Sequence, residues 1–419
     1  MYAKASPAII NFNVLLCLLS TCVAGSYIGI GGVNINSDRV MIVFLAMSTV
    51  IIRVFGWKPD GRRVFTIYWC FIYFIGLVFA TMAAQDSVRH LPGFIIYSAT
   101  IVCFLCVSSF NTDQAIEKYI TRILFLISGA SLIVYMAYLS NNDFGIFDFS
   151  SLLEGSRLQL TMPEPNIYGS TIGSFIILSL PYARKSGTTL VVYAMAFTAF
   201  SLCFSRGPFI SMVVALFVYF NKSSKKQIIM MMIFIVLVSL IWQIFGEDIA
   251  ALYNSSLNRA DSVSNRMRVL EVAMSRAMAS PIFGRGPLDL AISASYVSRM
   301  QGSHDIHAAW IWQIFVAVFH DTGLLGLVPF VMMLFSIFRA YVKVGLGNIS
   351  AVGMSYFCAF LFALMCSQFT TIHTTALFAF LGGAATSFIA RSSRPVGSLN
   401  ASPGTGRAVM HGLTSGRKA

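Results

Sequence analysis

Residues 64–84 read VFTIYWCFIYFIGLVFATMAA, a run of 21 residues without a charged side chain. About 20 consecutive apolar residues are enough for an α-helix to cross the hydrocarbon core of a bilayer. In that environment every backbone N–H and C=O group needs an internal partner, and a helix supplies one for each. The stretch therefore predicts a transmembrane helix.

The composition of the whole chain points the same way. Of 419 residues, 57% are hydrophobic and only 11% are charged, whereas soluble proteins carry about 25% charged residues. The sequence has no nucleotide-binding glycine loop, no Walker motif and no zinc-type pair of cysteines. A net charge of +13 does not by itself indicate nucleic-acid binding, because the placement of the charges matters more than their sum.

Apolar runs of roughly 17–21 residues occur at about twelve places, which predicts an all-α polytopic membrane protein. The first run resembles a signal peptide, but many spans follow it, so we interpret it as a retained helix. Cys103 and Cys106 lie one turn apart in such a run and are expected to be small buried hydrophobes. The clearest runs begin near Ile9, Val40, Val64, Phe94, Ile123, Tyr168, Leu190, Pro208, Ile228, Ala308, Ala351 and Thr374.

The connectors between these runs alternate in charge. By the positive-inside rule, the connectors rich in Lys and Arg are cytoplasmic, as are both termini, and the intervening connectors lie on the outer face of the inner membrane. The basic connectors are WKPDGRR (57–63), IEKYITR (116–122), ARKSG (183–187), NKSSKK (221–226), FRAYVK (338–343) and ARSSRP (390–395).

The predicted organisation has four parts. Residues 1–245 hold nine transmembrane helices, residues 246–307 form a large periplasmic loop with amphipathic helices, and residues 308–390 hold three more spans. Residues 391–419 form a basic cytoplasmic tail without an acidic residue. Such a tail cannot build a core, so we expect it to be disordered and weakly attracted to anionic lipid heads.

The loop 246–307 holds six arginines and two histidines in an otherwise apolar chain. Between residues 264 and 280, apolar side chains recur every three or four positions, which predicts an amphipathic helix. Ser262 or Ser264 is expected to cap its start, and Pro281 and Gly284 to end it. The helix either lies in the membrane interface or packs as a surface helix. Its apolar stripe consists of Met267, Leu270, Met274 and Met278.

The turn CFSRGPF (203–209) is a second place where polar residues reach the outer face. Gly207 and Pro208 are expected to open a helix, whose free N–H groups favour an anion. Arg206 beside that helix start is a natural phosphate ligand, because a guanidinium grips two oxygens at once. The alternative is an anchor to lipid head groups.

Two histidines, His304 and His307, come just before the helix that begins near Ala308. A histidine titrates near neutrality and can act as a general base, although at an interface it is often only a polar anchor. His320 and Asp321 are expected to lie deeper and to cap a helix or form a pair. His373 is expected in an outer turn, with either role.

Four motifs together resemble the O-antigen ligase and O-antigen polymerase superfamily. They are RLQLTMPEPNIYGS (157–170), CFSRGPF (203–209), NRMRVLEVAMSRAMASPIFGRGP (265–287) and a histidine leading into FHDTGLLGL (319–327). Their order, spacing and predicted sidedness agree with the family over residues 157–327.

The resemblance implies a GT-C-type membrane glycosyltransferase working at the periplasmic face. Its donor would be a glycan on undecaprenyl diphosphate, and the family needs no metal or other cofactor. By position, Arg206 and Arg266 match the family's two functional arginines. His307 matches the family histidine, although its interval to Gly323 is about one helical turn longer than usual, and His304 is the alternative.

The chemistry of such a transfer fits these residue types. A polyprenyl diphosphate leaving group needs its charge neutralised, and two arginines can do this. The attacking sugar hydroxyl must lose its proton to a histidine or to Glu164. Arg157, Glu164, Asn166 and Arg268 are expected to bind substrate.

Two questions about function stay open at this point. The acceptor is either another lipid-linked repeat unit, as for a polymerase, or a lipid A core, as for a ligase. The absence of an obvious platform for a lipid A core favours the polymerase slightly. A flippase or permease is the alternative of another class, because about twelve spans are common among transporters.

Overall fold

In the computed structural model, the protein is described at residues 15, 18, 27–30, 33–36, 64–108, 112–139, 153–154, 157–158, 165–183, 187–203, 205–221, 260–290, 313–345, 349–367 and 376–392. The prediction of a helical protein is confirmed for these residues. Two small hairpins accompany the helices: β1 (Tyr27–Ile30) pairs antiparallel with β2 (Val33–Asn36), and β3 (Leu153–Glu154) with β4 (Arg157–Leu158).

Long apolar helices dominate this part of the chain, and a 3₁₀ helix, η3 (Leu180–Tyr182), follows α6. The α-helices are α3 (Val64–Ala83), α4 (Ser87–Ser108), α5 (Asp113–Leu139), α6 (Pro165–Ser179), α7 (Gly187–Ser201), α8 (Arg206–Asn221), α10 (Ala260–Met278), α12 (Ile314–Val344), α13 (Ala351–Cys366) and α14 (Ala376–Ser392).

Four described stretches are long and apolar enough to cross a membrane: Thr66–Ala83, Ser87–Ser108, Asp113–Ala137 and Ile314–Val344. The helices α7, α8, α13 and α14 are apolar but shorter. The protein is therefore a membrane protein, and the run beginning at Val64 is confirmed as α3. The predicted spans near Val40 and Ile228 lie outside the described residues, so a total of twelve stays a prediction.

Two predicted cytoplasmic connectors are wrong as connectors. Residues 116–122 belong to the first turns of α5, and residues 338–343 to the last turns of α12. In α5, Ile116 and Ile120 are buried while Glu117, Lys118 and Arg122 are exposed. The helix continues past its apolar run because its charged positions all fall on the exposed face.

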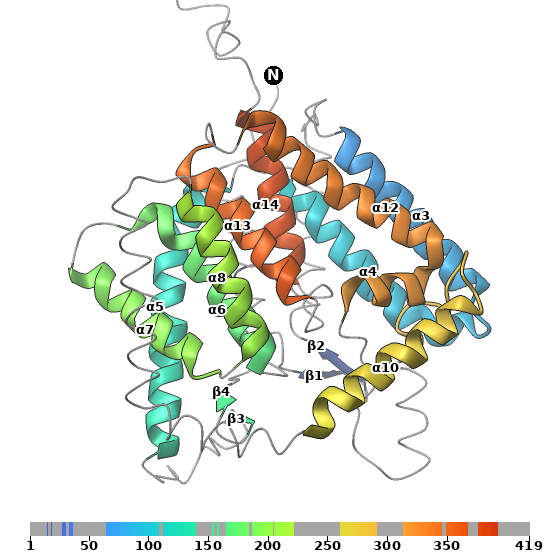
Figure 1. Cartoon of the computed structure of the whole chain (residues 1–419), viewed down its shortest axis with the longest axis horizontal. Coiled ribbons are helices and arrows are strands. Elements are labelled where there is room, and N and C mark those ends of the chain that lie inside the picture. The colour runs from blue at the N-terminus through green and yellow to red at the C-terminus, as the bar shows by residue number, and fades with distance from the viewer. Residues whose placement is uncertain are drawn as a thin grey trace, which may run out of the picture.

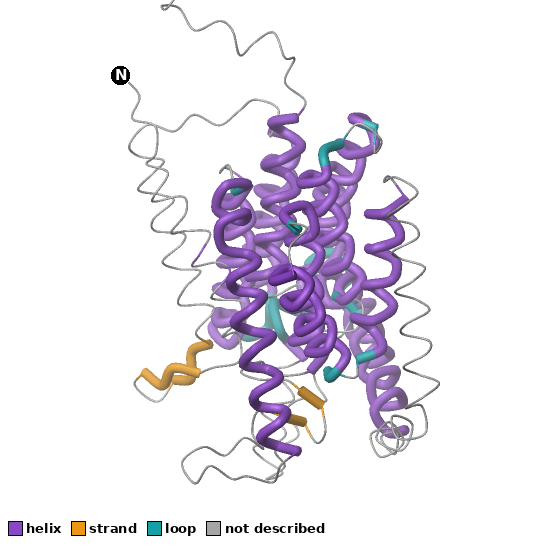
Figure 2. The backbone as a smooth tube through the Cα atoms, turned by 90° about the vertical axis from the view of Figure 1, so that its left-hand side faces the viewer, coloured by secondary structure: helices purple, strands orange, loops and turns teal. Residues whose placement is uncertain are grey.

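The helices pack as a bundle in which most of them run in roughly one direction (Figure 2). Helices α13 and α14 pack together at its centre, with α6 and α8 against α13 and with α4 against α14 (Figure 1). On one side α3 lies along α12, and on the other α5 lies along α7 (Figure 1). Cys103 and Cys106 are buried in α4, as expected for small hydrophobes.

Helix α6 is the most enclosed element, because all 15 of its residues are buried. Its small residues allow this close packing: a side chain at Gly169 would meet Cys203 and Pro208, and one at Gly173 would meet Phe362 and Met212. Its hydroxyl groups bond to carbonyls one turn earlier, as Ser170 does to Asn166. The start of α6 is thus held firmly against α8.

The close approach of α3 to α12 is a testable feature of this packing. A Cβ atom at Gly76 would lie 2.6 Å from the backbone oxygen of Leu325, so we expect Gly76→Ala to lower the free energy of unfolding by about 1–3 kcal/mol. Gly187→Ala is the control, because no atom lies within 4 Å of that Cβ position. Thermal denaturation in detergent measures both, and equal midpoints would contradict the packing described.

Candidate active site

Two of the predicted motifs, RLQLTMPEPNIYGS and CFSRGPF, meet around the turn between α7 and α8. The backbone N–H of Leu158 in β4 donates to the carbonyl of Leu202, with 3.1 Å between N and O. The hydroxyl of Ser205 donates to the side-chain oxygen of Asn166, and both residues are buried. The RLQ, EPN and SRG motifs are therefore brought together, although 44 residues separate Leu158 from Leu202.

Two helices begin at this place. Helix α6 starts at Pro165 and α8 starts at Arg206, with Pro208 in its first turn, as the sequence predicted. Because Ser205 bonds Asn166, the two helix starts are side by side. Helix N-termini carry free N–H groups and partial positive charge, so this region favours an anion.

Helix α10 confirms the predicted amphipathic helix and corrects its details. It ends at Met278, before Pro281, as expected, but it begins at Ala260, so Ser262 and Ser264 lie inside it and neither caps its start. Of the predicted apolar stripe, Met274 and Met278 are 39% and 66% exposed, whereas Leu270 packs against the protein.

The packed face of α10 consists of smaller side chains. Ala273 belongs to a small apolar cluster that also contains Leu290 and, from α12, Val316 and Ala317. Val269 and Leu270 pack against this cluster. This cluster is separate from the main core of the bundle. Helix α10 lies across one end of α3, α4 and α12 (Figure 1). It is a packed helix with a second, exposed apolar face.

The turn that follows α10 docks on a break in α12. At Gly323 the backbone has φ 61° and ψ −160°, which interrupts the helix. The N–H groups of Arg285 and Gly286 donate to the carbonyls of His320 and Asp321, at 2.8 and 3.0 Å. In return, Leu324 and Leu325 donate to the carbonyls of Pro281 and Ile282, at 2.8 and 3.2 Å.

Glycine is required where the two backbones touch. A Cβ atom on Gly284 would lie 2.5 Å from the N atom of Gly323, and both residues have positive φ. Gly286, with φ 103°, packs against the ring of His90 in α4. The PIFGRGP motif (281–287) and the HDTGLLG motif (320–326) are therefore two halves of one contact.

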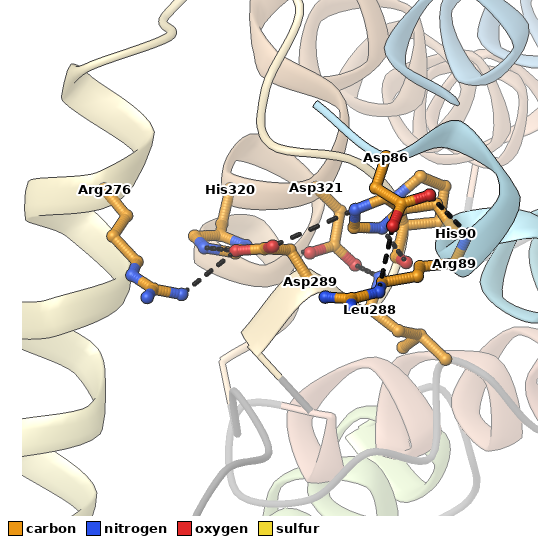
Figure 3. Close-up of polar contacts among 9 residues, drawn as sticks. Asp86, Arg89, His90, Arg276, Leu288, Asp289, His320 and Asp321 are labelled. Atoms are coloured by element: carbon orange, nitrogen blue, oxygen red, sulfur yellow. Dashed lines mark hydrogen bonds and ion pairs between the residues drawn. The ribbon is translucent and has the colours of Figure 1, made fainter. Parts of the chain in front are cut away.

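A buried polar cluster lies beside this contact (Figure 3). The carboxylate of Asp321 accepts three hydrogen bonds: from Tyr97 Oη at 2.9 Å, from the backbone N–H of Leu288 at 2.9 Å and from His320 Nδ1 at 2.8 Å. A carboxylate only accepts hydrogen bonds, so His320 Nδ1 is the donor in this contact. The expectation that His320 and Asp321 form a pair is confirmed.

A second carboxylate, Asp289, lies between two histidines in Figure 3. Its Oδ2 atom is 3.1 Å from the guanidinium of Arg276 in α10 and 3.7 Å from His320 Nε2, while its Oδ1 atom is 3.9 Å from His90 Nε2. His90 Nδ1 in turn donates to the carbonyl of Pro287, at 3.1 Å. Asp289 thus joins α10, α4 and α12 through side chains alone.

The predicted site residues are placed as follows. Arg157 lies in β4, Asn166 near the start of α6 and Arg206 at the start of α8, and all three elements meet near the turn between α7 and α8. Arg266 and Arg268 lie on α10. Glu164, His304, His307 and His373 lie outside the described residues. The structure therefore unites the first group and places the two α10 arginines on a separate helix.

Sequence reasoning missed the roles of His90, Tyr97, Arg276 and Asp289. The partners of Asp321 come from helices far apart in the chain, with 224 residues between Tyr97 and Asp321. The glycines of PIFGRGP (281–287) and HDTGLLG (320–326) were a usable signal for the contact between these segments, because glycine allows two backbones to approach closely.

Comparison with known families connects these motifs. Residues 191–331 match the model of a family described as O-antigen ligase. This segment is similar to the O-antigen ligase family. The match confirms the resemblance and spans both the SRG turn and α10, including Arg206, Arg266, Arg268, His304 and His307. Arg157, Glu164 and Asn166 precede it, and no curated protein sequence matches the chain.

The O-antigen ligase family indicates the general type of activity: a ligase or polymerase of surface polysaccharide that acts in a membrane on a lipid-linked glycan. The described helices agree with that setting, because four of them are apolar and long enough to cross a bilayer.

The hydrogen bond between Asn166 and Ser205 can be tested by substitution. In Asn166→Ala the Ser205 hydroxyl is left buried without this acceptor, so we expect the free energy of unfolding to fall by about 1–3 kcal/mol. Ser201→Ala is the control, because the exposed hydroxyl of Ser201 donates to the carbonyl of Phe197 one turn earlier in its own helix. If both variants melt at the same temperature in detergent, the turn is not held by Asn166.

Proposed function

We propose that the protein is a glycosyltransferase of the inner membrane that transfers a glycan from undecaprenyl diphosphate to a hydroxyl acceptor at the periplasmic face. The observation that carries this proposal is the family match over residues 191–331, which contains both Arg206 and Arg266. The convergence of two motifs at the start of α8 supports it. Both termini would lie in the cytoplasm.

The first step is recognition of the diphosphate. Arg206 stands at the start of α8, beside the start of α6, where an anion is favoured by the free N–H groups. Arg266 from α10 would supply the second guanidinium. Two arginines neutralise the leaving group as its bond to the sugar breaks, which a divalent cation does in other transferases.

The second step is activation of the acceptor. A sugar hydroxyl is a weak nucleophile, and the proton that it loses needs a base within hydrogen-bond distance. His307 is our first candidate for this base, with His304 and Glu164 as alternatives. Arg157, Asn166 and Arg268 would bind substrate around the reacting groups. Direct displacement would invert the anomeric centre.

No observation in the described residues favours a transporter. The buried charged or histidine side chains there are His90, His320 and Asp321, and they form one cluster instead of a path along the helices. That cluster lies near the loop between α3 and α4, which the positive-inside rule assigns to the outer face. The sequence favours a polymerase only slightly over a ligase, and the experiment below separates them.

The test compares surface glycans and the lipid-linked glycan pool in a deletion strain rescued by variants at matched protein levels. Arg206→Ala and Arg266→Ala should each lower activity about 100-fold or more, because each removes a charge that stabilises the leaving group. Arg266→Lys should fall between, since lysine keeps the charge without the two-pronged geometry. Arg339→Ala is the control, because this exposed arginine lies 19 residues beyond His320 along α12.

The glycans then identify the reaction. Single repeat units without a ladder would mean a polymerase, and full-length chains left on undecaprenyl diphosphate would mean a ligase. If both alanine variants restored a wild-type ladder, the two arginines would have no role and the proposed mechanism would be wrong.

A further inference from the structure

The attachment of α10 is weak for a helix that would carry a substrate-binding arginine. Its contact with α12 is made largely by small side chains, with Ala273 and Ala277 fully buried on the packed face. Methyl groups bury little apolar area, so they hold a helix less firmly than the aromatic side chains of the main core do. The turn after α10 is bonded to α12 through its backbone, and a side-chain contact adds to this attachment.

The ion pair between Arg276 and Asp289 supplies such a contact. Asp289 follows the docked turn, and its side chain is mostly buried, with 19% exposed. Arg276 reaches this carboxylate from α10 at 3.1 Å. The other side of Asp289 faces His320 and His90, which belong to α12 and α4 (Figure 3). Because Asp289 is bonded into the turn that docks on α12, its pair with Arg276 ties α10 to that docked turn.

Helix geometry gives the position of Arg266 around α10 relative to the packed alanines. Residue 266 precedes Ala273 by seven positions and Ala277 by eleven, so it lies within about 20° of both around the helix. Arg266 therefore occupies the face of α10 that packs on α12. Residue 268 is about 140° from Ala273 and lies on another face.

Distance decides what Asp289 can do. Arg266 is ten residues from Arg276, or about 15 Å along the helix. A general base must lie about 3 Å from the hydroxyl that it deprotonates, so Asp289 is too far from Arg266 to act as the base. A tilt of α10 by about 10° at Arg276 would, however, move residue 266 by about 2–3 Å. Errors of about 1 Å in such a group can cost 100-fold in rate.

We propose that Asp289 is a positioning residue, which through Arg276 sets the direction of α10 and so the place of Arg266. The proposal rests on the proposed function, because it acts through the diphosphate-binding role of Arg266. Asp289 itself touches no substrate. Asp289 belongs to the segment that docks on α12, and His320 and His90 border its carboxylate.

The first measurement is independent of activity. Amide hydrogen exchange of the full-length protein in nanodiscs should show faster exchange in residues 260–278 for Asp289→Asn and Arg276→Ala than for the wild type. Exchange in α13 should not change. Arg276→Lys should keep most of the protection, and Glu271→Gln, which removes an exposed charge from the same helix, should behave as wild type.

The second measurement is a double-mutant cycle on glycan transfer, with lipid-linked glycan extracted from the deletion strain as the donor. Asp289→Asn should lower kcat/KM between about tenfold and 100-fold. If Asp289 acts through Arg266, the double variant Asp289→Asn/Arg266→Lys should be no slower than Arg266→Lys alone, within about twofold. Purely structural damage would instead multiply the two losses.

The outcomes separate the two proposals. Unchanged exchange in α10, or losses that multiply in the cycle, would overturn the positioning role of Asp289. Full activity of Arg266→Lys and Arg266→Ala would count against the proposed function, and the exchange data would then still decide whether Asp289 holds α10.

Discussion

The contact between the turn after α10 and the break in α12 is the constraint on which this end of the molecule depends. A helix that is interrupted inside a protein leaves carbonyls without partners, and a buried carbonyl without a partner is costly. Here the N–H groups of Arg285 and Gly286 satisfy the carbonyls of His320 and Asp321. The two backbones can approach only because Gly284 and Gly323 lack side chains.

Once this contact exists, the polar cluster follows from it. The break turns Asp321 toward Tyr97 and Leu288, whose donors it accepts, and the turn delivers Asp289 to a position between α10 and α4. The rest of the bundle needs no such device, because α6, α13 and α14 are joined by tightly packed apolar side chains. A rigid scaffold thus supports a polar region at its end, an arrangement that suits a site needing precise geometry.

The comparison of sequence with structure shows which signals were local. The apolar run at Val64, the helix start at Arg206 and the end of α10 were predicted correctly, because length, proline and glycine act within a few residues. The pair of His320 and Asp321 could be predicted because the residues are adjacent. Charge was a poor guide to helix ends in α5 and α12, since an exposed face carries charges without ending a helix.

What the sequence did not provide were the long-range partners. Periodicity predicted an apolar stripe that includes Met274 and Met278, but it did not identify the face around Ala273 that packs on α12. The pairing of Asp289 with Arg276 depends on how the turn folds back, and a linear pattern does not contain that information. The meeting of Leu158, Asn166 and Ser205 was not visible for the same reason.

The docking of α10 also has a consequence for the order of assembly. Its packing partners Val316 and Ala317, and the carbonyls that receive its turn, lie in α12, which is synthesised later. While the ribosome is still making residues 291–313, the small-residue face of α10 lacks its partners on α12, and the turn after α10 can contact only α4. The predicted outer loop is therefore completed only when the first turns of α12 enter the membrane, so that insertion of one helix assembles the other.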